Sequence, residues 1–116
     1  MKVVLVEDES MVAMLLEDML ADLGHEVIAT AGRLNRAREC ASHAEADFAV
    51  IDLNLNGEQT YEVAQTFLDR GIPIIFSTGY CAAGLDPRWR RQPLLQKPFE
   101  LSALDGAIRD AMQAKA

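Results

Sequence analysis

The sequence predicts an α/β fold in which helices cover both faces of a doubly wound, five-stranded parallel sheet. Two observations lead to this class. Short apolar runs rich in β-branched residues alternate with amphipathic stretches of helical period, as in a parallel sheet with right-handed crossovers. The chain has 116 residues, of which 50% are hydrophobic. This length and composition suit a single domain over residues 1–116.

The first half of the chain contains three predicted strands and two predicted helices. Strands are expected at Lys2 to Val6, Glu26 to Ala29 and Phe48 to Ile51, the last leading directly into Asp52. The first helical stripe ends before Gly24, a suitable C′ residue, and consists of Val12, Leu15, Leu16, Met19 and Leu23. We expect the methionines of this helix to lie in the core. The second stripe consists of Leu34, Ala37, Ala41 and Ala44.

The second half continues the alternation with one interruption. A third helical stripe closes at Gly71, and a fourth strand runs from Pro73 to Ser77. Residues 79–93 contain two glycines and two prolines but no apolar stripe, so the fourth helix is expected to be short or irregular, near residues 86–91 at most. A short fifth strand at Leu94 and Leu95 and a final helical stripe from Leu101 to Met112 complete the pattern.

Five such units fit a flavodoxin-like sheet with strand order 2-1-3-4-5. Folds of this kind place their sites at the carboxyl ends of the strands, near the switch point between strands 1 and 3. Net charge is −7, which disfavours nonspecific binding of nucleic acid or anionic membranes. The sequence contains no membrane-length apolar run and no signal-peptide core, so we expect a cytoplasmic protein.

Polar residues follow four of the predicted strands at that edge. Glu7 and Asp8 follow strand 1, Asp52 follows strand 3, Thr78 ends strand 4 and Lys97 follows strand 5. Each has an ordinary alternative: an acid can cap a helix or make a turn, and a lysine is usually solvated. Their coincidence at one edge favours a shared site.

Three neighbouring carboxylates repel one another and need a cation to remain ionised together. Their hard oxygens suit Mg²⁺, which favours phosphate partners. Asp52 would then act as a carboxylate nucleophile toward a phosphoryl group, with Lys97 supplying positive charge and Thr78 a hydroxyl donor.

These residues resemble the receiver domain of bacterial two-component response regulators over essentially the whole chain. The resemblance rests on Val6-Glu7-Asp8-Glu9, Asp52, Thr78-Gly79 and Lys97-Pro98-Phe99. It implies that Asp52 is the phosphoacceptor, that Glu7, Asp8, Asp52 and the backbone carbonyl of Asn54 bind Mg²⁺, and that Thr78 and Lys97 bind the phosphoryl group. It also implies a cis peptide bond between Lys97 and Pro98.

A narrower resemblance comes from Phe76-Ser77-Thr78-Gly79-Tyr80, which is similar to the Phe-Ala-Thr-Gly-x-Tyr signature of the stand-alone "FAT GUY" receivers. Ser77 replaces the alanine, and Tyr80 follows Gly79 directly. Most receivers carry an aromatic residue three positions before the lysine, where this chain has Leu94. We therefore expect Tyr80 or the segment 79–93 to take over the switch role of that aromatic residue.

Residues 88–91 form a basic, aromatic cluster in an acidic chain. Two interpretations stay open for Arg88, Trp89, Arg90 and Arg91. They can form a docking patch, since Trp and Arg are favoured interface anchors, or Trp89 can pack the loop against the domain while the arginines remain solvated.

The function predicted from the resemblance is a phosphorylation-activated signalling switch, not a conventional enzyme. A sensor histidine kinase or a histidine phosphotransfer protein is the expected donor, and the output is a contact with a downstream protein in a phosphorelay. No direct contact with nucleic acid or membrane is expected, and a homodimer stays open. The alternatives are a pseudo-receiver that binds partners without phosphorylation, or a receiver fragment of a larger regulator. Hydrolases with an aspartyl nucleophile typically have a second acid where this chain has Asn54.

Overall fold

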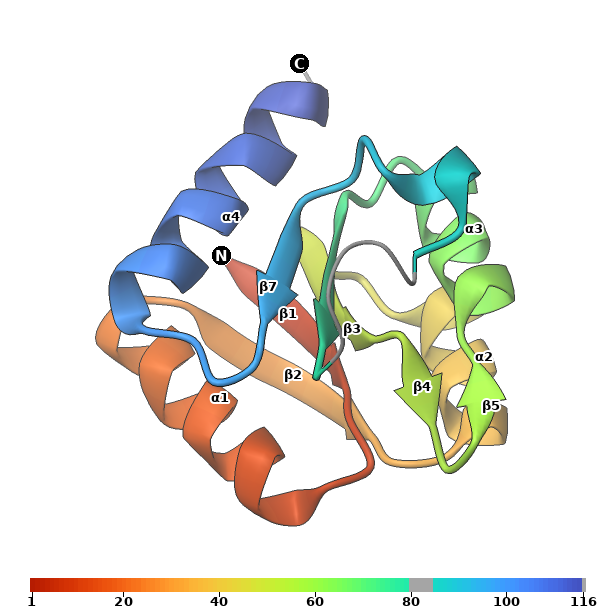
Figure 1. The fold of residues 1–116 in the computed structure, drawn as a ribbon, viewed down its shortest axis with the longest axis horizontal. Coiled ribbons are helices and arrows are strands. Elements are labelled where there is room, and N and C mark those ends of the chain that lie inside the picture. The colour runs from red at the N-terminus through yellow and green to blue at the C-terminus, as the bar shows by residue number, and fades with distance from the viewer. Residues whose placement is uncertain (80–84, 116) are drawn as a thin grey trace.

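A computed structural model describes residues 1–79 and 85–115 and has a five-stranded parallel sheet at its centre (Figure 1). The strand order is β2-β1-β3-β6-β7, which is the predicted order 2-1-3-4-5 once a separate two-stranded hairpin is set aside. The sheet consists of β1 (Lys2–Val6), β2 (Glu26–Ala31), β3 (Phe48–Asp52), β6 (Ile74–Thr78) and β7 (Leu94–Gln96). The predicted flavodoxin-like fold is thereby confirmed.

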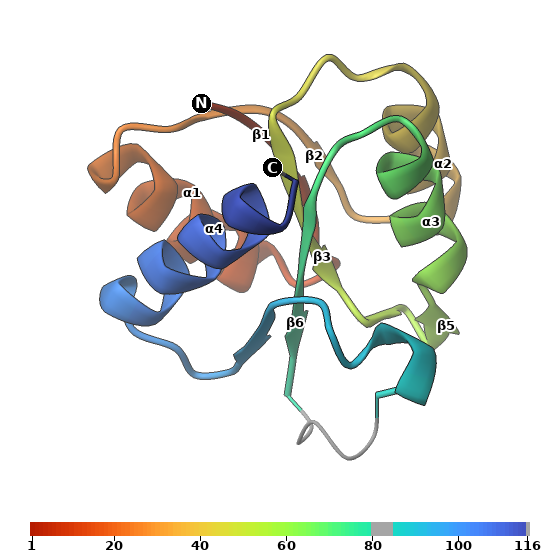
Figure 2. The ribbon, with the colours of Figure 1, turned by 90° about the horizontal axis from the view of Figure 1, so that it is seen from above.

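Two helices cover each face of the sheet (Figure 2). Helices α1 (Ser10–Asp22) and α4 (Leu101–Lys115) lie on one face, and α2 (Leu34–His43) and α3 (Tyr61–Asp69) lie on the other. In the described part of the chain, no helix is both long and apolar enough to cross a membrane.

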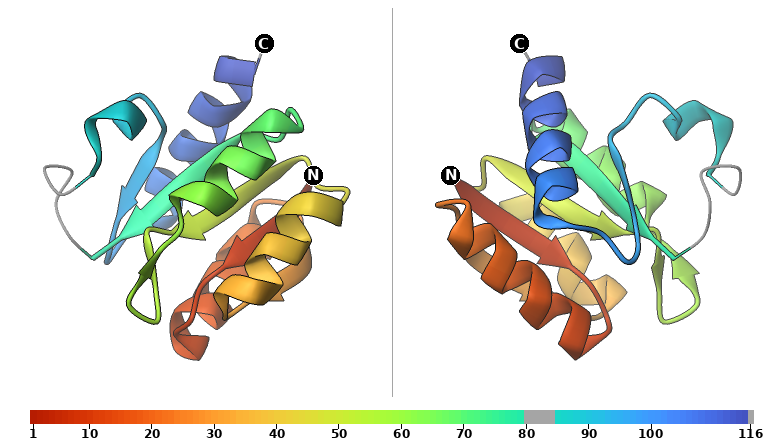
Figure 3. Two further views of the ribbon diagram at one scale, coloured as in Figure 1. Left: turned by 90° about the vertical axis from the view of Figure 1, so that its right-hand side faces the viewer. Right: turned by 60° about the vertical axis from the view of Figure 1, so that its left-hand side comes forward.

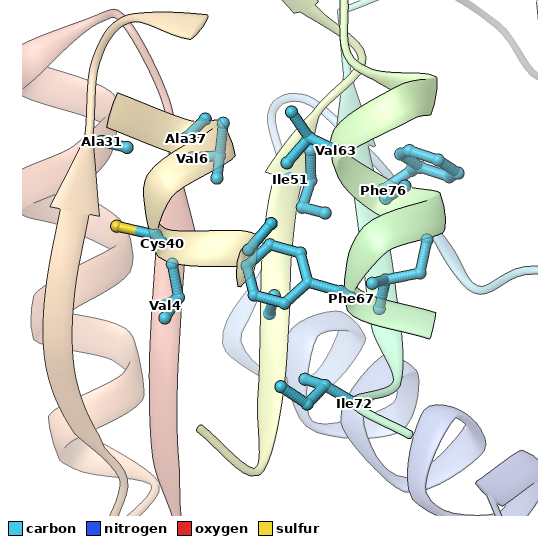
Figure 4. Packing of buried hydrophobic residues seen from close by; sticks show 14 of the residues in the cluster. Val4, Val6, Ala31, Ala37, Cys40, Ile51, Val63, Phe67, Ile72 and Phe76 are labelled. Atoms are coloured by element: carbon cyan, nitrogen blue, oxygen red, sulfur yellow. The ribbon is translucent and has the colours of Figure 1, made fainter. Parts of the chain in front are cut away.

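The core is divided by the sheet into two apolar clusters, because successive strand residues point to opposite faces. In β3, Ala49 and Ile51 pack under α2 and α3, whereas Phe48 and Val50 pack under α1 and α4. Figure 4 shows the cluster under α2 and α3, where Phe67 of α3 lies over β3 beside Ile51. All five residues of β3, including Asp52, are buried. The phosphoacceptor candidate therefore stands at the end of a completely buried strand.

Helices α1 and α3 end where the sequence predicted. Gly24 and Gly71 follow their helices with φ angles of 88° and 77°, a backbone region that glycine enters without a steric penalty. The N–H of His25 donates to the carbonyl of Leu20 at 2.8 Å, and that of Ile72 donates to Phe67 at 3.0 Å. These bonds satisfy carbonyls that the helix ends would otherwise leave unpaired.

The prediction for α1 was wrong at Leu15 and at two of the methionines. Leu15 is 50% exposed, Met14 63% and Met11 83%, whereas Leu16 is almost completely buried. Adjacent helical residues point about 100° apart, so Leu15 and Leu16 cannot both face the sheet. Helix α1 thus presents an apolar strip to solvent that the stripe in the sequence did not reveal.

A short hairpin follows β3 and was not predicted. It pairs β4 (Asn54–Leu55) with β5 (Glu58–Gln59), and the turn between them is Asn56-Gly57. Both turn residues have positive φ angles, 54° and 86°, as a type I′ turn requires. The Asn-Gly pair is the sequence signal that would have revealed it.

The expected irregular segment contains one turn of 3₁₀ helix, η2 (Pro87–Trp89). The prediction of a short helix near residues 86–91 is confirmed. The side chain of Asp86 caps this turn by accepting from the N–H of Arg88 at 3.0 Å. Tyr80 lies in the range 80–84, outside the described residues, so its switch role stays a prediction.

Candidate functional site

The carboxyl ends of the sheet strands meet at one edge, beside the β4–β5 hairpin (Figure 3). Glu7 and Asp8 directly follow β1, and Asp52 ends the neighbouring strand β3. One carboxylate oxygen from each of these three residues lies within 4.8 Å of the others. Glu7 and Asp52 are buried, whereas Asp8 is partly exposed. The three predicted metal-binding acids therefore form one cluster that is open to solvent on the side of Asp8.

Lys97 reaches across the sheet into this cluster. Its Nζ donates to Oε1 of Glu7 at 2.8 Å and to Oδ2 of Asp52 at 3.0 Å. The Lys97 backbone N–H donates to the carbonyl of Thr78 at 2.8 Å, which extends the β6–β7 pairing to the site. The peptide bond to Pro98 is cis, as the resemblance implied. The ordinary alternative for Lys97, a solvated side chain, is excluded by this geometry.

Burial and charge shift the protonation of this group. Burial raises the pKa of Glu7 to about 7, although hydrogen bonds from Lys97 and from the N–H of Glu9 oppose the shift. Burial alone would lower the pKa of Lys97, but its hydrogen bonds to Glu7 and Asp52 outweigh burial and raise that pKa. The lysine is therefore a firmly held cation, and the raised pKa lets Glu7 gain or lose a proton near neutral pH.

Backbone N–H groups hold one oxygen of each carboxylate. Oε2 of Glu7 accepts from Glu9, Oδ1 of Asp52 from Asn54, and Oδ2 of Asp8 from Asn56, each at 3.1 Å. The last of these bonds comes from the β4–β5 turn. The unpredicted hairpin thus has a direct role in orienting Asp8.

A cavity of about 610 Å³ gives access to the cluster. It is lined by the predicted residues Asp8, Asp52, Asn54, Thr78 and Lys97, together with Glu9, Gly57 and Gly79. Of the six residues predicted to bind metal or phosphate, Glu7 is the one outside the lining, and its carboxylate contacts Lys97. Asp52 thus lies at a cavity large enough for a small phosphorylated group, with acids and an ammonium group around it.

The donor set fits Mg²⁺. The acids offer hard carboxylate oxygens close together, and Asp8 faces the cavity, where a metal can keep water ligands. The described residues place no cysteine or histidine among these ligands, which disfavours Zn²⁺.

Sequence reasoning missed Thr60. This residue is completely buried, and its Oγ1 donates to the main-chain carbonyl of Asp52 at 2.6 Å. Its own N–H donates to the carbonyl of Leu53 at 3.2 Å. No local pattern announces such a contact, because Thr60 comes eight residues after Asp52 and reaches back through the fold.

Ser77 was also not predicted as part of the site. It pairs with Asp52 across β3 and β6 and is buried. Its Oγ finds no hydrogen-bond partner among the residues that the structure describes.

Trp89 points inward, which decides between the two interpretations of its own role. It is 8% exposed and stacks on Tyr61, with ring centroids 5.6 Å apart. Arg88, Arg90 and Arg91 remain exposed. Trp89 therefore packs the loop against the domain, and a docking role for the arginines stays a prediction.

Comparison with known proteins gives a consistent result. The family model described as the response regulator receiver domain matches residues 3–109. The chain is 30% identical over 115 residues to the transcriptional regulatory protein PdtaR of Mycobacterium tuberculosis, in an alignment that covers 96% of this chain and 56% of PdtaR. The chain thus spans only about half the length of that relative.

Two solved structures resemble the fold closely. The solution structure of SdrG from Sphingomonas melonis Fr1 has a TM-score of 0.87 at 34% identity, covering 96% of this chain and 95% of that one. The BeF3-activated conformation of SdrG from Pseudomonas melonis Fr1 has a TM-score of 0.82 at 34% identity, covering 94% of this chain and 93% of that one.

Proposed function

The chain belongs to the response regulator receiver domain family, and we propose that it is a signalling switch activated by phosphorylation of Asp52. The observation that carries this proposal is the position of Lys97. Its ammonium group contacts Asp52 and Glu7 at the inner end of a cavity that Asp52, Asp8 and Thr78 line. A buried carboxylate held by a lysine and backbone N–H groups, yet open on one side, suits a nucleophile for phosphoryl transfer.

In the proposed reaction, a carboxylate oxygen of Asp52 forms a bond to phosphorus while the bond between phosphorus and the donor's leaving group breaks. Lys97 stabilises the charge on the phosphoryl oxygens, and the Thr78 hydroxyl donates a hydrogen bond to one of them. Glu7, Asp8, Asp52 and the carbonyl of Asn54 would hold Mg²⁺, which supplies charge neutralisation to the transferring group. The N–H of Asn54 keeps the Asp52 carboxylate oriented throughout.

We propose a sensor histidine kinase or a histidine phosphotransfer protein as the physiological donor. The output is a changed surface that binds a downstream protein. The BeF3-activated conformation solved for the similar SdrG supports a phosphorylation-type switch, and residues 76–80 support the narrower "FAT GUY" resemblance.

Phosphoryl transfer from radiolabelled acetyl phosphate tests this function. We expect label on the wild-type protein in the presence of Mg²⁺, and loss of that label when EDTA is added. Asp52→Asn should lose the label. Asp69→Asn is the matched control, because Asp69 is an exposed acid at the end of α3 and should not affect labelling. Wild-type protein that takes up no label would instead favour a pseudo-receiver that binds partners without phosphorylation.

A further inference from the structure

Three aromatic side chains of this domain pack against one another between β6, α3 and η2. Leu94 occupies the β7 position where the resemblance leads one to expect an aromatic residue, and it pairs with Phe76 of β6. Phe76 makes edge contacts with Tyr61 and Trp89, at centroid distances of 5.9 and 5.5 Å. Tyr61 and Trp89 stack at 5.6 Å with an interplanar angle of 16°. Phe76, Tyr61 and Trp89 are named here the aromatic cluster.

One end of the aromatic cluster is joined to the phosphoacceptor. Tyr61 is the first residue of α3, and the residue before it is Thr60. The buried Thr60 hydroxyl donates to the Asp52 carbonyl at 2.6 Å. A second connection runs through β6, since Phe76 lies two residues before Thr78 in the same strand. A shift of the main chain at Asp52 would therefore displace the first residues of α3.

The other end of the aromatic cluster holds the surface segment 85–92. The Tyr61 hydroxyl accepts from the N–H of Asp86 at 2.9 Å, and Trp89 belongs to η2 within this segment. Figure 2 shows η2 on the side of the domain where α3 begins, next to β5.

The segment is attached mainly by the packing of Leu85 and Trp89, which are both buried in the cluster under α2 and α3. Among the described residues 85–92, the remaining hydrogen bonds run within the segment, as between Arg88 and Asp86. A segment held to the domain by packing and by one hydrogen bond to Tyr61 follows the side chains on which it packs, so a displacement of Tyr61 can change its position.

We propose that Thr60 and Tyr61 are positioning residues that transmit the state of Asp52 to the surface segment 85–92. The inference rests on the proposed phosphorylation of Asp52 and explains how its effect leaves the site without an aromatic residue at position 94. When the main chain at Asp52 shifts, Thr60 shifts with it through their hydrogen bond, and the adjacent Tyr61 moves as well. The hydrogen bond from Asp86 and the ring stack with Trp89 then carry this movement to the segment. The exposed Arg88, Arg90 and Arg91 are carried on the segment that moves.

The fluorescence of Trp89 tests this directly, because the chain contains one tryptophan. Beryllofluoride with Mg²⁺ serves as the phosphoryl mimic, and its binding is followed independently by fluorine NMR. In the wild-type protein we expect a change in Trp89 emission on binding. Thr60→Val removes the hydroxyl at nearly constant shape and should reduce that change at least twofold, while Thr60→Ser should restore it.

Tyr61→Phe gives a second variant that keeps the ring stack. It removes only the hydroxyl that accepts from Asp86, and we expect it to bind beryllofluoride with a reduced emission change. Suppose that wild-type protein and Thr60→Val both bind the mimic. If their Trp89 emission then changes equally, or changes in neither protein, the transmission proposal is wrong, while phosphorylation of Asp52 stands. If fluorine NMR shows no bound mimic that depends on Asp52, the proposed function fails, and the transmission proposal fails with it.

Discussion

Single residues set the chemistry of the site, and Glu7 shows how. It is buried against Lys97 and Asp52, and burial raises its pKa to about 7. In the metal-free protein, the free-energy cost of burying the Glu7 charge therefore exceeds the stabilisation that its contact with Lys97 provides. A divalent cation would reverse that balance, since it stabilises the ionised form of every carboxylate that binds it.

This balance predicts a pH dependence of stability. The folded-state pKa of Glu7 lies above its ordinary value of 4.5, at about 7. The folded state therefore holds the proton more tightly, and the contribution of Glu7 to the free energy of unfolding is lost as pH rises between these values. Urea unfolding in EDTA measures this at acidic and at weakly alkaline pH. As pH rises, the free energy of unfolding of the wild-type protein should fall relative to that of Glu7→Gln. A difference between the two proteins that stays constant with pH would contradict the assignment.

The sequence was informative about single residues wherever strand ends place them. Asp8, Asp52, Thr78 and Lys97 line one cavity because parallel strands end at a common edge, and that rule needs no side-chain detail. Thr60 and Ser77 escaped prediction for a different reason. Thr60 makes a hydrogen bond across the fold, and the Ser77 hydroxyl finds no partner among the described residues. Neither feature can be read from the spacing of residues in the sequence.

Elements differ in how completely a local pattern determines them. The strands and helix ends followed from apolar period and glycine placement, but helix α1 carries more apolar residues than the sheet can cover, so its buried face was misjudged at Leu15. The β4–β5 hairpin is too short for a hydrophobic period to reveal, although its Asn56-Gly57 turn is a known signal. The hairpin matters for function because its turn donates the N–H that holds Asp8.

Two glycines provide a test of the hairpin. Gly57 has a φ angle of 86°, whereas Gly106 lies inside helix α4, and a Cβ at either position would meet no atom within 4 Å. Gly57→Ala should therefore cost about 1 kcal/mol through backbone strain alone. Gly106→Ala should instead stabilise the helix by about 0.5–1 kcal/mol.

Chemical denaturation of both variants measures these effects. Because the hairpin orients Asp8, Gly57→Ala should also weaken Mg²⁺ binding, and Gly106→Ala should leave it unchanged. Equal effects of the two substitutions on stability would show that the backbone at Gly57 is not under the constraint that its φ angle indicates.

The whole molecule is a helix-covered sheet with a cavity at one edge, and the segment 85–92 packs beside that edge through Leu85 and Trp89. The sheet fixes Glu7, Asp52 and Lys97 from three different strand ends, so the site is formed by the fold as a whole. Fold class and strand order were predictable because alternation and length admit few topologies. The inward orientation of Trp89 was not, because a tryptophan among arginines suits a docking patch and a packed loop equally well until Tyr61 and Phe76 are placed around it.

The central claim is that Asp52 carries the phosphoryl group, and locating the modified residue tests it most directly. Protein treated with acetyl phosphate and Mg²⁺ is reduced with borohydride, which converts a phosphorylated aspartate to homoserine, and the peptides are then sequenced by mass spectrometry. We predict homoserine at position 52 and at no other acid. Homoserine at Asp8 or at a surface carboxylate, with Asp52 unmodified, would contradict the account.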